Sequence, residues 1–174
     1  MTKEFKGTSQ LAMLADALPV RARVSLVLFA AERALQYLQS SPDFNLARDA
    51  LALVSNWHQG KPVDLDELEA RLEAEETSLS FAALRGKERS EEELRAWCVL
   101  ANAIDYVAYR AFRAENRTPW SSLSEIDETV LDALDNDLRA LQLSSMALMT
   151  RAAVYLKQCP NVTLAQLKVQ ISKQ

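Results

Sequence analysis

The sequence predicts an all-α fold, a single compact multi-helix domain of about six to eight helices over residues 1–174. Apolar residues make up 49% of the chain and recur with a helical period almost throughout. Only three glycines are present in 174 residues, which disfavours strands joined by many tight turns. Serine, threonine or aspartate followed three residues later by an acid or amide marks several helix starts. This length is enough for one domain with a buried core.

The first half of the chain is expected to form four helices. We expect a short helix over residues 9–18 and a longer one from Pro19 to about residue 39, because proline is favoured in the first turn of a helix. A third helix over residues 45–59 should end at Gly60 in the left-handed conformation. Asp64 and Glu67 have capping-box spacing, and the helix that they begin should bury Leu65, Leu68 and Leu72.

The second half continues the pattern. Residues 77–89 are expected to form a loop with a helical turn. Ser90 with Glu93 predicts the start of a long helix to about residue 116. Ser124 with Asp127 predicts another helix, which should bury Val130, Leu134 and Leu138 and expose its acidic side chains. Further helices are expected over residues 145–158 and, capped by Thr163, near the C-terminus.

Negative charge is concentrated in two short windows. Residues 64–76 carry seven carboxylates against Arg71 alone, and residues 125–137 carry six carboxylates and no base. Enrichment of acids in the first turn of a helix is explained by the helix dipole, but most of these acids lie later, where that effect has faded. Exposed like charges three or four residues apart cost a few tenths of a kcal/mol per pair. We therefore interpret the two acidic stripes as binding surfaces for a basic protein partner, with plain solubility as the alternative.

The predicted partner-binding residues are the acids with helical spacing in these windows. They are Asp66, Glu69, Glu73, Glu76, Glu125, Glu128, Asp132 and Asp135. Whether the two stripes share one face depends on packing that the sequence leaves open.

No catalytic residues, cofactor or metal site are predicted. His58 is the only histidine, it has no evident serine or cysteine partner in sequence, and no Glu-x-x-His pair is present. Asp105 neighbours a buried stripe and is expected to bond to a tyrosine or an arginine, with a direct contact to a partner as the alternative. The bases are dispersed and the pI is about 5.1, which disfavours nucleic-acid binding.

The absence of two kinds of segment from the sequence predicts where the protein is located in the cell. No apolar run is long enough to span a bilayer, and no cleavage site follows an apolar block near the N-terminus, so we expect a cytoplasmic protein without membrane contact. Cys98 and Cys159 are expected to be reduced thiols. Self-association is left open.

Two runs of residues give a resemblance to a known family. One is Ala50–Gly60, with Trp57-His58-Gln59-Gly60 at its end, followed by the acidic leucine helix of residues 64–73. The other is Ala103–Tyr109, followed by Pro119 and the acidic segment of residues 125–134. This order resembles the immunity protein six family of bacterial polymorphic-toxin systems, over roughly residues 46–134.

The resemblance implies an all-α antitoxin in bacterial competition. Such a protein would bind the toxin domain of a cognate secretion-system effector in the cytoplasm and block it, with no catalysis and no cofactor. Three alternatives stay open: a helical adaptor or regulatory protein with another basic partner, a hydrolase that reverses a toxin's modification, and a ligand-sensing helical domain without a DNA reader.

Overall fold

A computed structural model describes residues 9–73 and 89–173, apart from residues 120, 125, 128 and 142. Over these residues the predicted all-α fold is confirmed, and no strand is present. The helices of seven residues or more are α1 (Gln10–Asp16), α2 (Val20–Leu35), α3 (Phe44–His58), α4 (Leu65–Glu73), α6 (Glu91–Ala114), α8 (Val130–Leu141), α9 (Leu143–Gln158) and α10 (Leu164–Ser172). Two single-turn helices, η1 (Gln36–Leu38) and α7 (Ser121–Ser124), are also present in the described part of the chain.

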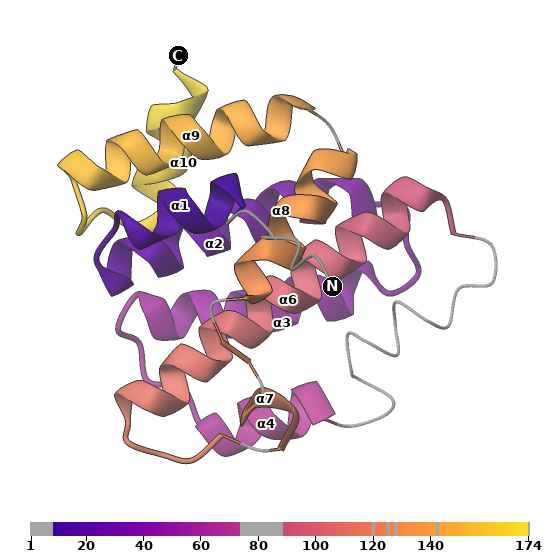
Figure 1. Ribbon diagram of the computed structural model, residues 1–174. Helices are drawn as coiled ribbons and strands as arrows, with labels where there is room; N and C mark the ends of the chain where they lie inside the picture. The colour runs from indigo at the N-terminus through magenta and orange to yellow at the C-terminus, as the bar shows by residue number, and fades with distance from the viewer. Residues whose placement is uncertain are drawn as a thin grey trace, which may run out of the picture.

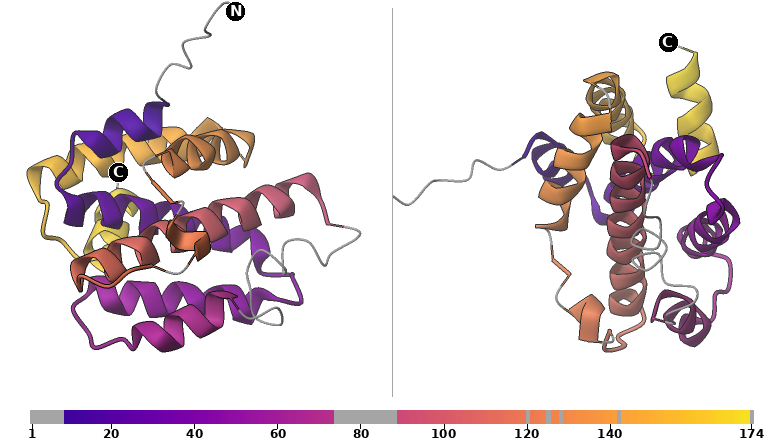
Figure 2. Two further views of the ribbon diagram at one scale, coloured as in Figure 1. Left: turned by 60° about the horizontal axis from the view of Figure 1, so that its bottom comes forward. Right: turned by 90° about the vertical axis from the view of Figure 1, so that its right-hand side faces the viewer.

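The long helix α6 is the centre of the arrangement. It packs most extensively against α2 and α8, and α3 also contacts it (Figure 1). Figure 2 shows α3 and α4 along one side of α6, with α1 and α8 on the other. Helices α9 and α10 pack on α2 and close the end opposite α4. The acidic helix α4 is therefore at the edge of the molecule.

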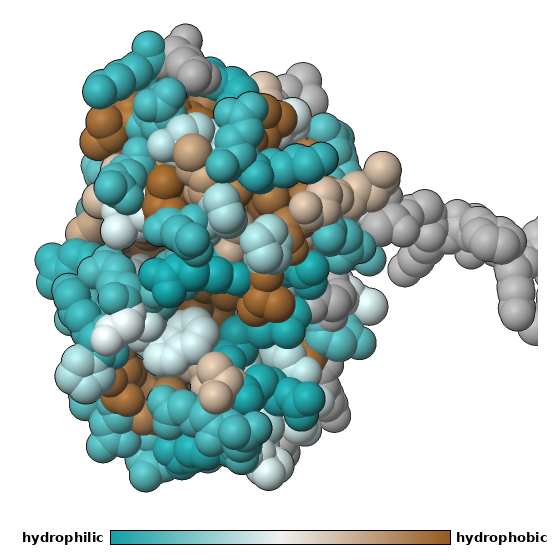
Figure 3. Space-filling view, turned by 90° about the vertical axis from the view of Figure 1, so that its left-hand side faces the viewer, coloured by the Kyte–Doolittle hydropathy of each residue, from teal (hydrophilic) through white to brown (hydrophobic). Residues whose placement is uncertain are grey.

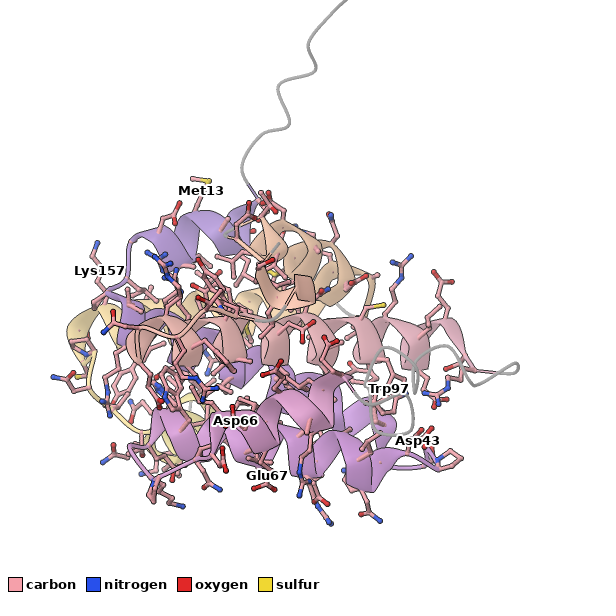
Figure 4. All side chains as sticks on the ribbon, turned by 90° about the horizontal axis from the view of Figure 1, so that it is seen from below. Met13, Asp43, Asp66, Glu67, Trp97 and Lys157 are labelled. Carbon is pink, nitrogen blue, oxygen red and sulfur yellow. The ribbon has the colours of Figure 1, made fainter. Side chains whose placement is uncertain are left out.

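The side chains of α6 show why this helix is central. Trp97, Tyr106 and Phe112 are fully buried, and all three lie on its apolar face. Burying aromatic side chains of this size is the dominant stabilising term of such a core. The guanidinium of Arg89 lies 5.0 Å from the centre of the Trp97 ring and 3.0 Å from Asp43, so it links the start of α6 to the start of α3 (Figure 4).

Three predicted helix starts are confirmed by hydrogen bonds. The Ser9 hydroxyl accepts from the backbone N–H of Ala12, and the Ser90 hydroxyl accepts from that of Glu93. Thr163 and Gln166 form a complete capping box at α10. Gly60 has φ +77°, the left-handed conformation predicted after α3.

The predicted start of α8 is wrong. Ser124 ends the turn α7, and α8 begins only at Val130. The carboxylate of Asp127 accepts from the backbone N–H and the hydroxyl of Thr129, so it closes a local turn instead of capping a helix. The loop predicted over residues 77–89 lies outside the described residues, except for Arg89. Among the described helices, none combines the length and the apolar content needed to cross a membrane.

Candidate partner-binding surface

Helix α4 exposes the first acidic stripe because its leucines face inward. Leu65, Leu68 and Leu72 are buried against the rest of the molecule. The side chains of Asp66 and Glu67 are 75% and 55% exposed (Figure 4). Glu73 is exposed, and Glu69 is half-buried. The alternation that predicted the helix therefore also places these acids on its outer side.

A base from a distant part of the sequence partly balances this stripe. Arg117, three residues after α6, forms an ion pair with Asp66. This hydrogen bond and the charges of Asp66, Glu115 and Glu69 raise the pKa of Arg117. Arg71 pairs with Glu67 at 3.1 Å. Asp66 and Glu67 are thus engaged within the chain, and the local charge count along the sequence did not reveal the partner of Asp66.

Glu69 differs from these two neighbours. Its carboxylate makes no hydrogen bond or ion pair within the part of the chain that the structure describes. Together with Glu73, it supplies the negative charge at the middle and end of α4. Glu76, from the same predicted stripe, lies outside the described residues.

Asp105 of α6 lies close enough to α4 for Glu73 to affect its charge. Burial and then the negative charge of Glu73 raise the pKa of Asp105 to about 7. The expected bond from a tyrosine or an arginine is absent, since no hydrogen bond to this carboxyl group occurs among the described residues. Burial and the Glu73 carboxylate therefore both disfavour the ionised form of Asp105.

An open hollow lies beside the start of α4. It has a cavity volume of about 610 Å³ and lies between the end of α3, the α3–α4 connection and Glu115 after α6. Trp57, Lys61 and Asp64 line it. The end of the molecule that carries the C-termini of α3 and α6 faces the viewer in Figure 3, where apolar and weakly polar surface lies between strongly polar groups. A half-exposed tryptophan among polar groups is typical of protein-binding sites.

The second acidic stripe has a different role from the predicted one. Asp135 is only 3% exposed, and its carboxylate accepts hydrogen bonds from the backbone N–H of Leu11 at 3.3 Å and from Arg139 at 2.8 Å. Asp132 accepts from the backbone N–H of Ser9 at 3.1 Å. The prediction that Asp135 lies on the outer side of α8 is therefore wrong. These two acids bind the N-terminus of α1, where unpaired N–H groups and the helix dipole favour negative charge.

The other acids of residues 125–137 do not form an exposed stripe within the described residues either. Asp137 is buried and pairs with Arg95 of α6 at 2.9 Å. Glu125 and Glu128 lie outside the described residues. The structure thus brings Asp66, Glu69 and Glu73 together on α4, and it places Asp132 and Asp135 at the α1–α8 contact.

His58 has a partner that the sequence did not reveal. Its Nε2 lies 2.7 Å from the hydroxyl of Ser25, on α2, and both residues are buried. Burial, and then the charge of Arg21, lower the pKa of His58 to about 4, so the ring is neutral at physiological pH. The pair joins α2 to α3 inside the molecule, which is a structural arrangement. Among the described residues, no group of three or more histidines, cysteines, aspartates and glutamates is placed to hold a metal ion.

A comparison with protein families gives a match over most of the chain. The family model described as Immunity protein Imm6 matches residues 22–141, from the first turn of α2 to the end of α8. The chain belongs to the Imm6 family. This confirms the resemblance drawn from the Trp57 and Asp105 segments. No curated protein and no solved structure matches the chain. Helices α1, α9 and α10 lie outside the region matched by the Imm6 model.

Proposed function

We propose that this Imm6 protein binds a cognate toxin directly and blocks it by covering a basic surface of the toxin. The exposed acids of α4 are the observation that carries this proposal, and family membership supports the general role. Glu69 and Glu73 would meet lysines or arginines of the toxin, with Asp66 beside them. The protein would act in the cytoplasm, where a toxin delivered by a competitor would do its damage.

The neighbouring hollow supports the choice of this surface over other exposed charges. Acidic side chains steer a basic partner toward the complex, whereas buried aromatic contacts supply most of the affinity. Trp57 and Asp64 line the hollow at the start of α4, so an aromatic side chain lies close to the first turn of the acidic helix. The acids of α8 are not part of the proposal, because α1 and α6 already occupy them.

Binding without catalysis would be the mode of protection. A stoichiometric inhibitor protects only while it is at least equimolar with the toxin, whereas a hydrolase that repairs a modified target protects at far lower amounts. Titration of toxin activity against added Imm6 protein should end sharply at a fixed molar ratio. Protection at a small fraction of that ratio would favour the hydrolase alternative.

The acidic surface can be tested with charge-neutral variants of similar shape. The toxin is first identified by pull-down from the native host with mass spectrometry. The double variant Glu69→Gln/Glu73→Gln should then associate roughly 10-fold more slowly at low salt, with a weaker salt dependence, because steering depends on these charges. Asp66 is left intact so that Arg117 keeps its ion pair.

The matched control is Asp49→Asn/Glu92→Gln, which removes two exposed acids from α3 and α6. This control should associate as the unmodified protein does. If both double variants associate more slowly by the same factor, the change in net charge explains the slower association, and the α4 surface does not. Unchanged association of the α4 variant at low salt would overturn the proposed surface.

A further inference from the structure

A small pocket lies on the side of the molecule away from α4, between α2, α9 and α10. Helix α10 contacts both α9 and α2 there, and Figures 1 and 2 show the three helices together. The cavity has a volume of about 210 Å³. Phe29 of α2, Leu148 of α9 and Ile171 of α10 form its apolar part. This pocket shares no lining residue with the hollow beside α4.

Arg33 gives the pocket a positive charge that no acid among the described residues pairs with. Arg33 lines the cavity and is half-buried, and within the described chain its side chain forms no hydrogen bond and no ion pair. Its Nε is shielded from water and has no acceptor. An arginine side chain remains charged at all physiological pH values and carries five N–H donors. A buried donor without an acceptor is unfavourable, so turning this side chain toward an anion in the cavity would remove that cost.

The other charged groups of the pocket cancel each other. Lys168 of α10 pairs with Glu32 of α2 at 2.8 Å. The lining as a whole therefore carries one net positive charge, which Arg33 supplies. A monoanion would balance this charge, whereas a phosphate dianion would bring a second negative charge close to Glu32 and to apolar walls.

We propose that this pocket binds a small organic monocarboxylate. Its carboxylate would accept paired N–H bonds from Arg33, the geometry in which arginine binds carboxylates best. Its hydrocarbon part would contact Phe29, Leu148 and Ile171. The cavity is smaller than the pockets that hold drug-sized ligands, so a short chain fits it better than a long fatty acid. This site is independent of toxin binding, and its absence would leave the proposed function untouched.

Hexanoate is the probe for the test, with hexanol as the neutral analogue and inorganic phosphate as the dianion. Titrations of the full chain are followed by calorimetry and by NMR signals of Ile171 and Leu148. Hexanoate should bind saturably and shift both methyl signals, hexanol should bind at least 10-fold more weakly, and phosphate should not shift the signals. Arg33→Gln should weaken hexanoate binding at least 10-fold, as expected for loss of paired charge-assisted hydrogen bonds.

The control variant is Arg48→Gln, because Arg48 is an exposed arginine that pairs with its neighbour Asp49. Hexanoate binding should survive this change. A second variant, Leu148→Phe, narrows the cavity while leaving Arg33 in place, and it should also weaken binding. Lack of saturable hexanoate binding, equal binding by Arg33→Gln, or preference for phosphate over hexanoate would each overturn the proposal.

Discussion

Two ion pairs with the same spacing show how differently this molecule uses its acids. Arg71 and Glu67 on α4 are four residues apart, as are Arg139 and Asp135 on α8. The Glu67 side chain is 55% exposed, whereas that of Asp135 is 5% exposed and also receives the backbone N–H of Leu11. One pair is surrounded by water, and the other joins two helices.

The difference shows that the role of an acidic stripe depends on which element packs against it. On α4 the apolar side chains already account for the buried face, so the acids remain outside. On α8 the N-terminus of α1 packs against the acidic side and uses its carboxylates as acceptors. Charge on α8 should therefore support folding, whereas charge on α4 should be neutral or opposed to it.

The largest expected effect comes from removing the buried acid. Asp135→Ala leaves the Leu11 N–H without its acceptor and removes the buried carboxylate from Arg139, which keeps its bond to the Gln10 side chain. The change should lower the free energy of unfolding by about 3 kcal/mol. Urea denaturation at pH 7 measures this change in the free energy of unfolding. Asp49→Ala, an exposed acid on α3, is the control and should stay within about 0.5 kcal/mol. If Asp135→Ala behaved like this control, the contrast between the two helices would be broken.

The second largest expected effect is a gain in stability, and its size depends on pH. The folded-state pKa of Asp105 is about 7, above the ordinary aspartate value of 3.8, so the folded protein favours the protonated form. The contribution of this group to the free energy of unfolding is fully present below about pH 4 and is lost as the pH rises through 7. Asp105→Asn should therefore raise the free energy of unfolding by about 2 kcal/mol at pH 8 and have almost no effect at pH 4.

Denaturation curves of Asp105→Asn and the unmodified protein at both pH values supply the measurement. Glu73→Gln removes the charge that faces Asp105, so it should produce a smaller gain of the same sign at pH 8. A loss of stability at pH 8 in Asp105→Asn would show that the carboxylate has a favourable partner, contrary to its surroundings in the structure.

The smallest expected change in stability comes from breaking the exposed ion pair of Glu67 and Arg71. Glu67→Gln removes the partner of Arg71 in water, and it should change the free energy of unfolding by at most about 0.5 kcal/mol. The same denaturation assay, repeated in 1 M salt, should reduce even this difference. A cost comparable to that of Asp135→Ala would mean that the α4 acids are structural after all.

The helices were predictable because they depend on local patterns. The caps at Ser9, Ser90 and Thr163, the left-handed Gly60 and the inward leucines of α4 each follow from a few adjacent residues. The start of α8 was not, because Asp127 closes a turn with Thr129 at the spacing where a capping box was expected.

The candidate site was predictable only in part, for the same physical reason. The exposed acids of α4 follow from its period, but the contact of Asp66 with Arg117 spans 51 residues of sequence. The bonds from Ser9 and Leu11 to α8 span more than 120 residues. Ser25 lies 33 residues before His58, and nothing near either residue signals their pairing. Contacts of this range are decided by packing.

The solitary imidazole of this chain offers a practical consequence. His58 is the only histidine, so the ring protons of one residue appear in a spectral region free of other imidazoles. Because the ring touches both α2 and α3, its signals report directly on whether those two helices remain apposed. A titrating ring with an ordinary midpoint near 6.5 would mark an opened molecule, and one that resists protonation until about pH 4 would mark an intact one. The protein thus carries its own unlabelled sensor of structural integrity for every variant described above.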